Sequence, residues 1–229
     1  MEISVSHLLD GAKRAMGLAV IIDVFRAFSV ACYCMGNGAE KIIPVADIGF
    51  AYKLKEKKPD YLLIGERQGK KQPGFDFGNS PASLENEDFT GKTVVQTTSA
   101  GTQGIVKAVN ADQIIAASLV NAPAVVKYIR AEKPAVVSLV CMGNAGISTA
   151  EEDLLCAEYI KNSLENLPYN LQDGINRLKH SNGRRFFDPA NSGWAPERDF
   201  YLCTDLGRFD FVLRAEKKPG LLHLIKVSL

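Results

Sequence analysis

Histidine and cysteine are scarce in this chain, and neither occurs in a pattern that marks a catalytic or metal site. The three histidines, His7, His180 and His223, are scattered, which weakens the case for a Ser-His-Asp triad or a phosphohistidine mechanism. The five cysteines form no C-x-x-C pair and no Cys/His zinc spacing. We therefore expect free, mostly buried thiols in a reducing compartment and no cysteine nucleophile.

An excess of charge of either sign is also missing. Lys plus Arg number 27 and Asp plus Glu number 26, so the net charge is +1, which gives no reason to expect nucleic acid or a membrane surface as a partner. No apolar run approaches the roughly 18 residues of a membrane span, and charged residues interrupt the N-terminal region. We expect a cytoplasmic protein, and the sequence leaves a homodimer open.

Several signatures of phosphate chemistry are absent as well. No Walker A loop and no G-x-G-x-x-G turn occurs, so a nucleotide site is unsupported. A cysteine phosphatase needs Arg six residues after its nucleophile, and Ile147 stands there after Cys141. An aspartyl-phosphate enzyme needs a second Asp two residues after the first, and Phe25 stands there after Asp23. For a phosphatase, this favours direct attack by a metal-activated water over a covalent intermediate.

What the sequence does have is a regular alternation of short β-branched apolar runs and longer amphipathic ones. This alternation is typical of βα units. We predict a single domain over residues 1–229 with a three-layer α/β/α fold, whose sheet is mostly parallel and mixed at the edge. The expected strands are 18–22, 41–45, 61–64, 93–96, 113–119 and 135–140, followed by two strands, 209–215 and 221–227, that we place as antiparallel edges.

Residues 65–81 break this rhythm with four glycines and two prolines. A structureless loop of this length inside a compact domain is usually functional or disordered, and its aromatic residues make disorder the weaker option. Residues 164–194 are polar, and we assign no regular element to them.

Nearly every predicted strand is followed by polar, reactive residues, and ligands of open α/β sheets bind outside the carboxyl ends of the strands. Residues 97–102 offer hydroxyls and a glycine between a strand and a helix, which suits anion binding. An ordinary turn with threonines as helix caps explains the same pattern equally well. Asn121 follows another strand and is placed to cap the next helix.

Four carboxylates are candidate ligands for Mg²⁺, which prefers one or two carboxylates with waters and substrate oxygens. Asp23 and Glu66 follow strands directly, Asp76 lies in the long loop, and Asp153 lies in the first turn of a helix. We expect Asp23, Glu66 and Asp153 to be catalytic. The alternatives are ion pairing with a nearby arginine for Asp23 and Glu66, an Asx turn for Asp76, and a preference for the helix dipole for Asp153.

Arg26 and Arg67 follow their carboxylates closely. A guanidinium fork matches phosphate, sulfonate or carboxylate oxygens, so two of them suit a substrate with more than one negative charge. Alternatively, both are structural partners of the acids.

Six segments together closely resemble one family, the ComB family of 2-phosphosulfolactate phosphatases. They occur in the family's order and cover about residues 18 to 160, whereas the C-terminal part matches more loosely. The segments are Ile22-Asp23-Val24-Phe25-Arg26-Ala27, Leu63-Ile64-Gly65-Glu66-Arg67, Pro73-Gly74-Phe75-Asp76-Phe77-Gly78-Asn79-Ser80-Pro81, Thr97-Thr98-Ser99-Ala100-Gly101-Thr102, Ser118-Leu119-Val120-Asn121-Ala122 and Glu152-Asp153-Leu154-Leu155-Cys156-Ala157.

The resemblance implies a Mg²⁺-dependent hydrolase that converts 2-phospho-3-sulfolactate to 3-sulfolactate and phosphate, a step towards coenzyme M in methanogens. A substrate with phosphate, sulfonate and carboxylate groups fits two arginines and a hydroxyl-rich loop. Phe28 stands where Thr is more usual, and the loop after Gln96 lacks the usual Asn-Gly. The residues expected at the substrate are Arg26, Arg67, Asn79, Ser80, Thr97, Thr98, Ser99, Gly101, Thr102 and Asn121.

A different class of function stays open, namely a non-catalytic small-anion-binding protein or a Rossmann-like protein that uses a nucleotide. The glycine spacing speaks against the nucleotide, and several carboxylates around one anion site make sense only with a cation. Phosphate release from small phosphate esters, with and without Mg²⁺, separates these hypotheses.

Overall fold

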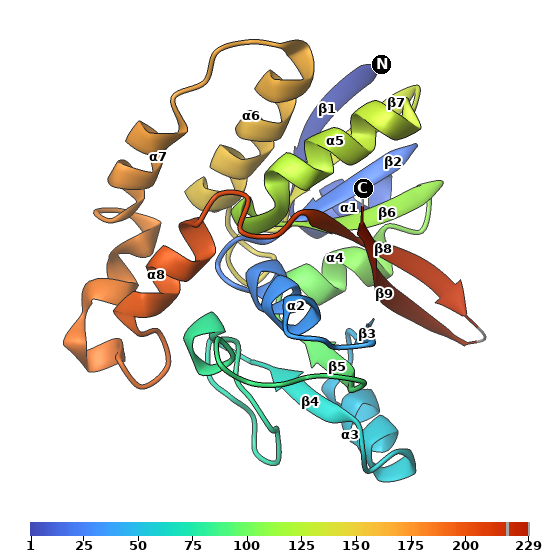
Figure 1. The fold of residues 1–229 in the computed structure, drawn as a ribbon, viewed down its shortest axis with the longest axis vertical. Coiled ribbons are helices and arrows are strands. Elements are labelled where there is room, and N and C mark those ends of the chain that lie inside the picture. Colours follow the sequence, from blue (N-terminus) through green and yellow to red (C-terminus); the bar gives the residue numbers. More distant parts are fainter. Residues whose placement is uncertain (219, 229) are drawn as a thin grey trace.

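The predicted alternation of strands and helices is present in the computed structural model, which describes residues 1–218 and 220–228 (Figure 1). Within these residues nine strands form one sheet in the order β1-β7-β2-β6-β8-β9-β3-β5-β4. The strands are β1 (Glu2–His7), β2 (Leu18–Ile22), β3 (Lys41–Pro44), β4 (Leu62–Gly65), β5 (Thr93–Thr97), β6 (Gln113–Ala117), β7 (Val136–Cys141), β8 (Phe211–Lys218) and β9 (Leu221–Ser228).

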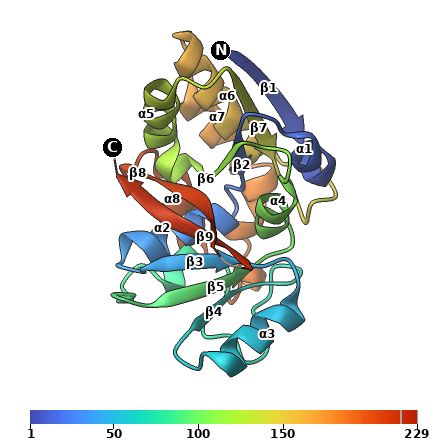
Figure 2. The ribbon, with the colours of Figure 1, turned by 90° about the vertical axis from the view of Figure 1, so that its right-hand side faces the viewer.

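Helices cover both faces of the sheet and make the expected three layers (Figures 1 and 2). They are α1 (Leu8–Arg14), α2 (Ala27–Gly36), α3 (Ile48–Lys57), α4 (Gly101–Lys107), α5 (Ala122–Glu132), α6 (Glu151–Glu165), α7 (Leu171–Leu178) and α8 (Glu197–Thr204). Ala19 and Ile21 of β2 pack in a core with side chains of α2 and α4, whereas Val20 and Ile22 pack in a second core with α5 and α6, because successive strand residues face opposite sides. None of the helices in the described residues is long and apolar enough to cross a membrane.

The two final strands are antiparallel, as predicted, but the prediction that they lie at an edge is wrong. β8 pairs with β6, and β9 pairs with β3, so the hairpin lies at the centre of the sheet. The parallel groups β1-β7-β2-β6 and β3-β5-β4 would otherwise end in unpaired strands at β6 and β3. The hairpin supplies ladder partners to both, which removes two exposed edges.

The hairpin also sets how the two parallel groups face each other. Three antiparallel pairings separate β6 from β3, so the groups run in opposite directions along the ladder. Neighbouring strands twist by about 20–25°, which over the steps from β2 to β5 sums to roughly 100–125°. This accumulated twist turns the group β3-β5-β4 part of the way back from the opposite direction. β3 and β5 therefore lie across the direction of β1 (Figure 2). The carboxyl ends of β2, β4 and β5 meet as a result.

Candidate active site

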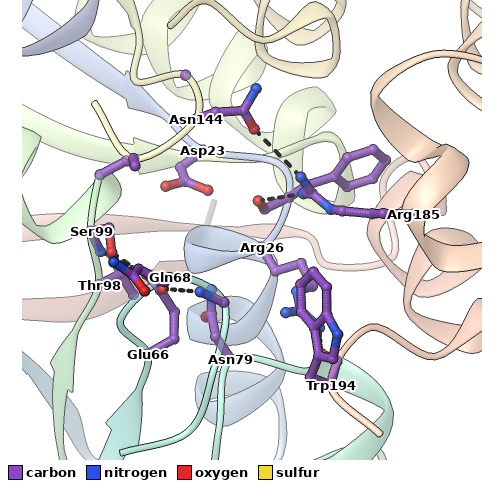
Figure 3. A pocket seen from close by; sticks show the side chains of 15 residues that line it. Asp23, Arg26, Glu66, Gln68, Asn79, Thr98, Ser99, Asn144, Arg185 and Trp194 are labelled. Carbon is purple, nitrogen blue, oxygen red and sulfur yellow. Dashed lines mark hydrogen bonds between the residues drawn. The ribbon is translucent and has the colours of Figure 1, made fainter. Parts of the chain in front are cut away.

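One pocket lies where β2, β4, β5 and β7 end, and the C-terminal part of the chain closes its far side (Figure 3). Its volume is about 240 Å³, which suits a small molecule. Part of the predicted set of site residues therefore clusters at one rim of the sheet. The predicted residues that line the pocket are Asp23, Arg26, Glu66, Asn79, Thr98 and Ser99.

Asp23 follows β2, and its carboxylate points into the pocket (Figure 3). Its Oδ1 accepts the N–H of Ala27 at 3.0 Å. Burial raises the pKa of Asp23 to about 7; the charge of Glu66 adds to this shift, and the N–H groups of Ala27 and Gly101 oppose it. A buried carboxyl group beside another acid takes up a proton or a cation near neutral pH.

Glu66 faces the same pocket from the end of β4. Its Oε1 accepts the N–H of Ser99 at 2.7 Å, and its Oε2 accepts the N–H of Gly69 at 2.7 Å. Gly65 permits this approach of β4 to β5, because it has a φ of +146° and a Cβ there would lie 1.9 Å from the backbone oxygen of Thr97. The hydroxyl of Ser99 also donates to Oε2 at 3.2 Å, so the contacts fix Glu66 and leave a free lone pair on Oε1.

The loop at residues 97–102 uses backbone N–H groups to hold protein carboxylates. The N–H of Ser99 is bonded to Glu66, and the N–H of Gly101 lies close enough to Asp23 to lower its pKa. These donors are therefore occupied, and the loop does not present them to a free anion. It positions the two acids that face the pocket.

The threonines of this loop act mainly on the loop itself. The N–H of Thr98 donates to Thr102 Oγ1 at 2.9 Å, and the N–H of Thr102 donates to Thr98 Oγ1 at 3.2 Å. These two hydrogen bonds close the turn before α4. This is the arrangement expected if the threonines cap the helix and do not bind an anion. Thr97, Gly101 and Thr102 do not line the pocket, so substrate contact stays a prediction for Thr98 and Ser99.

Asp153 lies behind the pocket. It is 2% exposed, and its Oδ1 and Oδ2 accept the N–H groups of Val24 and Gly143, each at 2.8 Å. Burial raises the pKa of Asp153, and the charges of Asp23 and Glu152 add to the shift. Because Asp153 does not line the pocket and its two oxygens accept backbone N–H groups, it fits a positioning residue that joins α6 to the ends of β2 and β7.

Arg26 lines the pocket, but a carboxylate from the C-terminal part neutralises it. Its Nη1 donates to Asp199 Oδ2 and to the backbone oxygen of Trp194, both at 2.6 Å. Asp199 is fully buried and also accepts the hydroxyl of Ser80 at 2.8 Å. Arg26 therefore forms the structural ion pair that was the alternative to substrate binding, but its partner is Asp199 and not Asp23. Ser80 belongs to the same hydrogen-bond network.

Arg67, Asp76 and Asn121 do not line this pocket. Arg67 donates to Thr97 Oγ1 at 2.7 Å and to two backbone oxygens. Asp76 Oδ2 accepts the N–H of Leu63 at 2.7 Å, near the end of β4 that lies away from Glu66, so it is badly placed to share a metal with Asp23. Asn121 is fully buried and accepts the N–H of Ser118 at 2.9 Å, which closes the turn before α5.

The predicted set of site residues lacks five polar or aromatic residues that line the pocket, namely Phe25, Gln68, Asn144, Arg185 and Trp194. Arg185 belongs to a short 3₁₀ segment, Asn182–Phe187, and Trp194 packs against Gly69. The segment around them is polar and without a period, so the periodicity that identified the strands carried no signal here.

The cysteines take no part in the site. All five are free and buried, and Cys141 does not line the pocket. Burial raises the pKa of Cys141, and a protonated thiol is a poor nucleophile.

Asp23, Glu66 and Asn79 fit a divalent cation better than the four carboxylates expected from the sequence. Asn79 Oδ1 is buried and has no hydrogen-bond partner among the described residues. Mg²⁺ takes one or two carboxylates and fills its other positions with neutral oxygens and waters. In the described part of the chain, no group of three or more His, Cys, Asp or Glu side chains could hold a metal alone, so substrate and water oxygens would have to complete such a site.

The ion pair of Arg26 and Asp199 should stabilise the fold. We expect Arg26→Met and Asp199→Asn each to lower the free energy of unfolding by about 3–5 kcal/mol, because each leaves a buried charge without its partner. Arg198→Met is the control on the same helix, since its pair with Glu85 is exposed and should contribute about 1 kcal/mol or less. Urea denaturation measures the three losses, and equal small losses would contradict the structural role.

The stability of the metal-free protein should depend on the ionisation of Asp23. Its pKa is about 7 in the folded protein against 3.8 for the ordinary group, so the folded state binds more protons between these values. Stability should therefore fall as pH rises from about 4 to about 7. At pH 8 in chelator, Asp23→Asn should be more stable than the wild type by on the order of 1–3 kcal/mol. Thermal unfolding curves at several pH values test this, and parallel pH profiles would contradict it.

Comparison with known proteins agrees with the geometry. The chain matches the family model described as 2-phosphosulpholactate phosphatase over residues 4–218. A Thermotoga petrophila protein named probable 2-phosphosulfolactate phosphatase is 41% identical over 156 residues, which are 68% of this chain and 65% of that protein. Proteins with the same name from Bacillus subtilis and Thermoplasma volcanium are each 32% identical, over 86% and 90% of this chain and 86% and 93% of their own lengths. The resemblance seen in the six segments is confirmed, and the chain belongs to the 2-phosphosulpholactate phosphatase family, a family of phosphoric monoester hydrolases.

Proposed function

We propose that this protein is a Mg²⁺-dependent phosphatase that hydrolyses 2-phospho-3-sulfolactate, or a similar small polyanionic phosphate ester, to the hydroxy acid and phosphate. One observation carries the proposal: Asp23 and Glu66, from the ends of two separate strands, line one small pocket together with Asn79 and Arg185. Acids and a guanidinium in one pocket suit an anion that is bound through a cation. The names of the relatives agree with this chemistry.

Asp23, Glu66 and the Oδ1 of Asn79 are the groups that would hold Mg²⁺. When bound, Mg²⁺ stabilises charge on the phosphoryl oxygens and lowers the pKa of a water molecule. In the reaction the water oxygen forms a bond to phosphorus as the ester P–O bond breaks, and the proton that the water loses balances the one that the released alcohol oxygen takes up. A neighbouring cation lowers the pKa of a carboxyl group, so Asp23 would be ionised during turnover.

The remaining pocket residues orient the ester and limit water. Phe25 and Trp194 provide aromatic walls, and in a site with less water the charges of Asp23 and Glu66 act more strongly. Asp153 holds the backbone next to Asp23 through its bond to Val24. The chain thus fixes its acids before the substrate arrives, which is the arrangement that electrostatic catalysis requires.

The decisive experiment measures phosphate release from 2-phospho-3-sulfolactate. We expect release with Mg²⁺, none in EDTA, and recovery when Mg²⁺ is restored. Asp23→Asn and Glu66→Gln should lower kcat/KM by at least about 100-fold, because each removes a charge that holds the cation. Asp76→Asn is the matched control and should stay within about 3-fold of the wild type, since Asp76 does not line the pocket.

Three outcomes would contradict parts of this proposal. Full activity in EDTA would exclude the metal requirement. No phosphate release from this ester or related small esters would exclude the phosphatase. An inactive but folded Asp76→Asn variant would show that the metal site is built differently.

A further inference from the structure

Two arginines, Arg26 and Arg185, line the pocket, and of the two only Arg26 forms an ion pair in the described residues. Arg26 lies 2.6 Å from Asp199, whereas in the described residues no carboxylate oxygen lies within 4.0 Å of the nitrogens of Arg185. Glu152 attracts Arg185 at a longer distance, yet burial still lowers the pKa of Arg185 on balance. A desolvated cation without a contacting anion destabilises its surroundings, and an anionic ligand offsets that cost.

The hydrogen bonds of Arg185 leave donors for a ligand. Its Nη2 donates to the backbone oxygen of Phe25 at 3.2 Å, and its Nη1 donates to Asn144 Oδ1 at the long distance of 3.4 Å. Its Nε is buried and has no partner in the described part of the chain. A guanidinium has five N–H donors, so one N–H on each of Nη1 and Nη2 remains in addition to the buried Nε.

Aromatic rings hold this guanidinium in place. Its central carbon lies 5.7 Å from the ring centre of Phe25 and 5.0 Å from that of Phe186. Such stacking fixes the plane of the fork before a ligand binds. Arg26 is held in the same way, with its central carbon 5.7 Å from the ring centre of Phe186, but it has a contacting carboxylate, whereas in the described residues Arg185 is oriented without one and keeps unused donors.

The place of Arg185 in the pocket indicates which part of a substrate it meets. Figure 3 shows it reaching in from the C-terminal side, across from Glu66 and Ser99, with Asp23 between the two sides. On the proposed function, the phosphate binds beside the acids that hold the cation. A group on the opposite side therefore meets the other end of the molecule.

We propose that Arg185 is a specificity-determining residue that binds the anionic group farthest from phosphorus, the sulfonate in 2-phospho-3-sulfolactate. This assignment rests on the proposed function and adds a selection rule to it. Esters with a second strong anion at that position are good substrates, and esters without it lose the contact and leave the half-buried Arg185 without an anionic partner. Selection of this kind penalises the absent group more than it rewards the present one.

The test compares two substrates and three variants. 2-Phospholactate has the phosphate and the carboxylate of 2-phospho-3-sulfolactate and lacks the sulfonate. We expect Arg185→Met to lower kcat/KM for 2-phospho-3-sulfolactate by about 10- to 100-fold, as loss of a charge-assisted hydrogen bond implies, and to change that for 2-phospholactate by less than about 3-fold. Arg185→Lys, which keeps the charge without the fork, should show a smaller loss confined to the same substrate.

Arg184→Met is the matched control. Arg184 is the exposed neighbour of Arg185 in the same 3₁₀ segment and lines a different pocket, beside His180 and Asp188. Its replacement should leave both substrates unaffected. Melting temperatures of all variants show which of them are folded, and the substrate ratio is independent of the folded fraction because both substrates are measured on one preparation.

The outcomes separate this inference from the proposed function. If the wild type hydrolyses neither compound, the proposed function fails. If it hydrolyses both equally well, or if Arg185→Met slows both by the same factor, the phosphatase stands and the assignment of Arg185 to the distal anion is overturned. A substrate-selective loss in Arg184→Met equal to that in Arg185→Met would overturn it as well, since a diffuse charge effect would then explain the selectivity.

Discussion

The site depends on the backbone ladder of the β8–β9 hairpin, because that ladder joins two parallel groups of strands that are otherwise separate. Asp23 belongs to one group and Glu66 to the other. The joints are short, and four of their residues are fully buried: Leu213 of β8 lies opposite Ala116, and Leu224 of β9 lies opposite Ile42. Two acids that share one pocket are thus held by strands from near the C-terminus that contribute no side chain to it.

The electrostatics of the site follow from this convergence. Asp23, Glu66, Glu152 and Asp153 are all buried, and desolvation, together with the repulsion between neighbouring acids, raises the pKa values of Asp23 and Asp153. Backbone N–H groups of Ala27, Ser99 and Val24 offset part of that cost. A protein that keeps acids this close has given up stability in its metal-free state, as functional sites commonly do. On the proposed function, a cation held by Asp23 and Glu66 would offset the repulsion that the N–H groups leave.

The sequence predicts local elements better than it predicts partners. β2 lies where it was expected, because an apolar run bounded by Gly17 and Asp23 has one local solution. The central position of the hairpin has no local signature, since pairing is decided between strands far apart in the chain. Asp199 carries an overlooked signal: it shares a helix face with Leu202 and Cys203, so its burial, and hence a partner, could have been expected. Arg185 carries no such signal, because its segment has no period.

The pocket is built from two parts of the chain, which supply different kinds of residue. The strand ends hold the acids, and they lie in the segments that resemble the family closely. The C-terminal part supplies Arg185 and Trp194, and there the resemblance is looser. The buried pair of Arg26 and Asp199 connects the two parts, since it ties the turn after β2 to the first turn of α8. On the proposed function, the chemistry therefore resides in the sheet and the selectivity in the segment packed against it, so substrate preference can change among relatives while the acids stay in place.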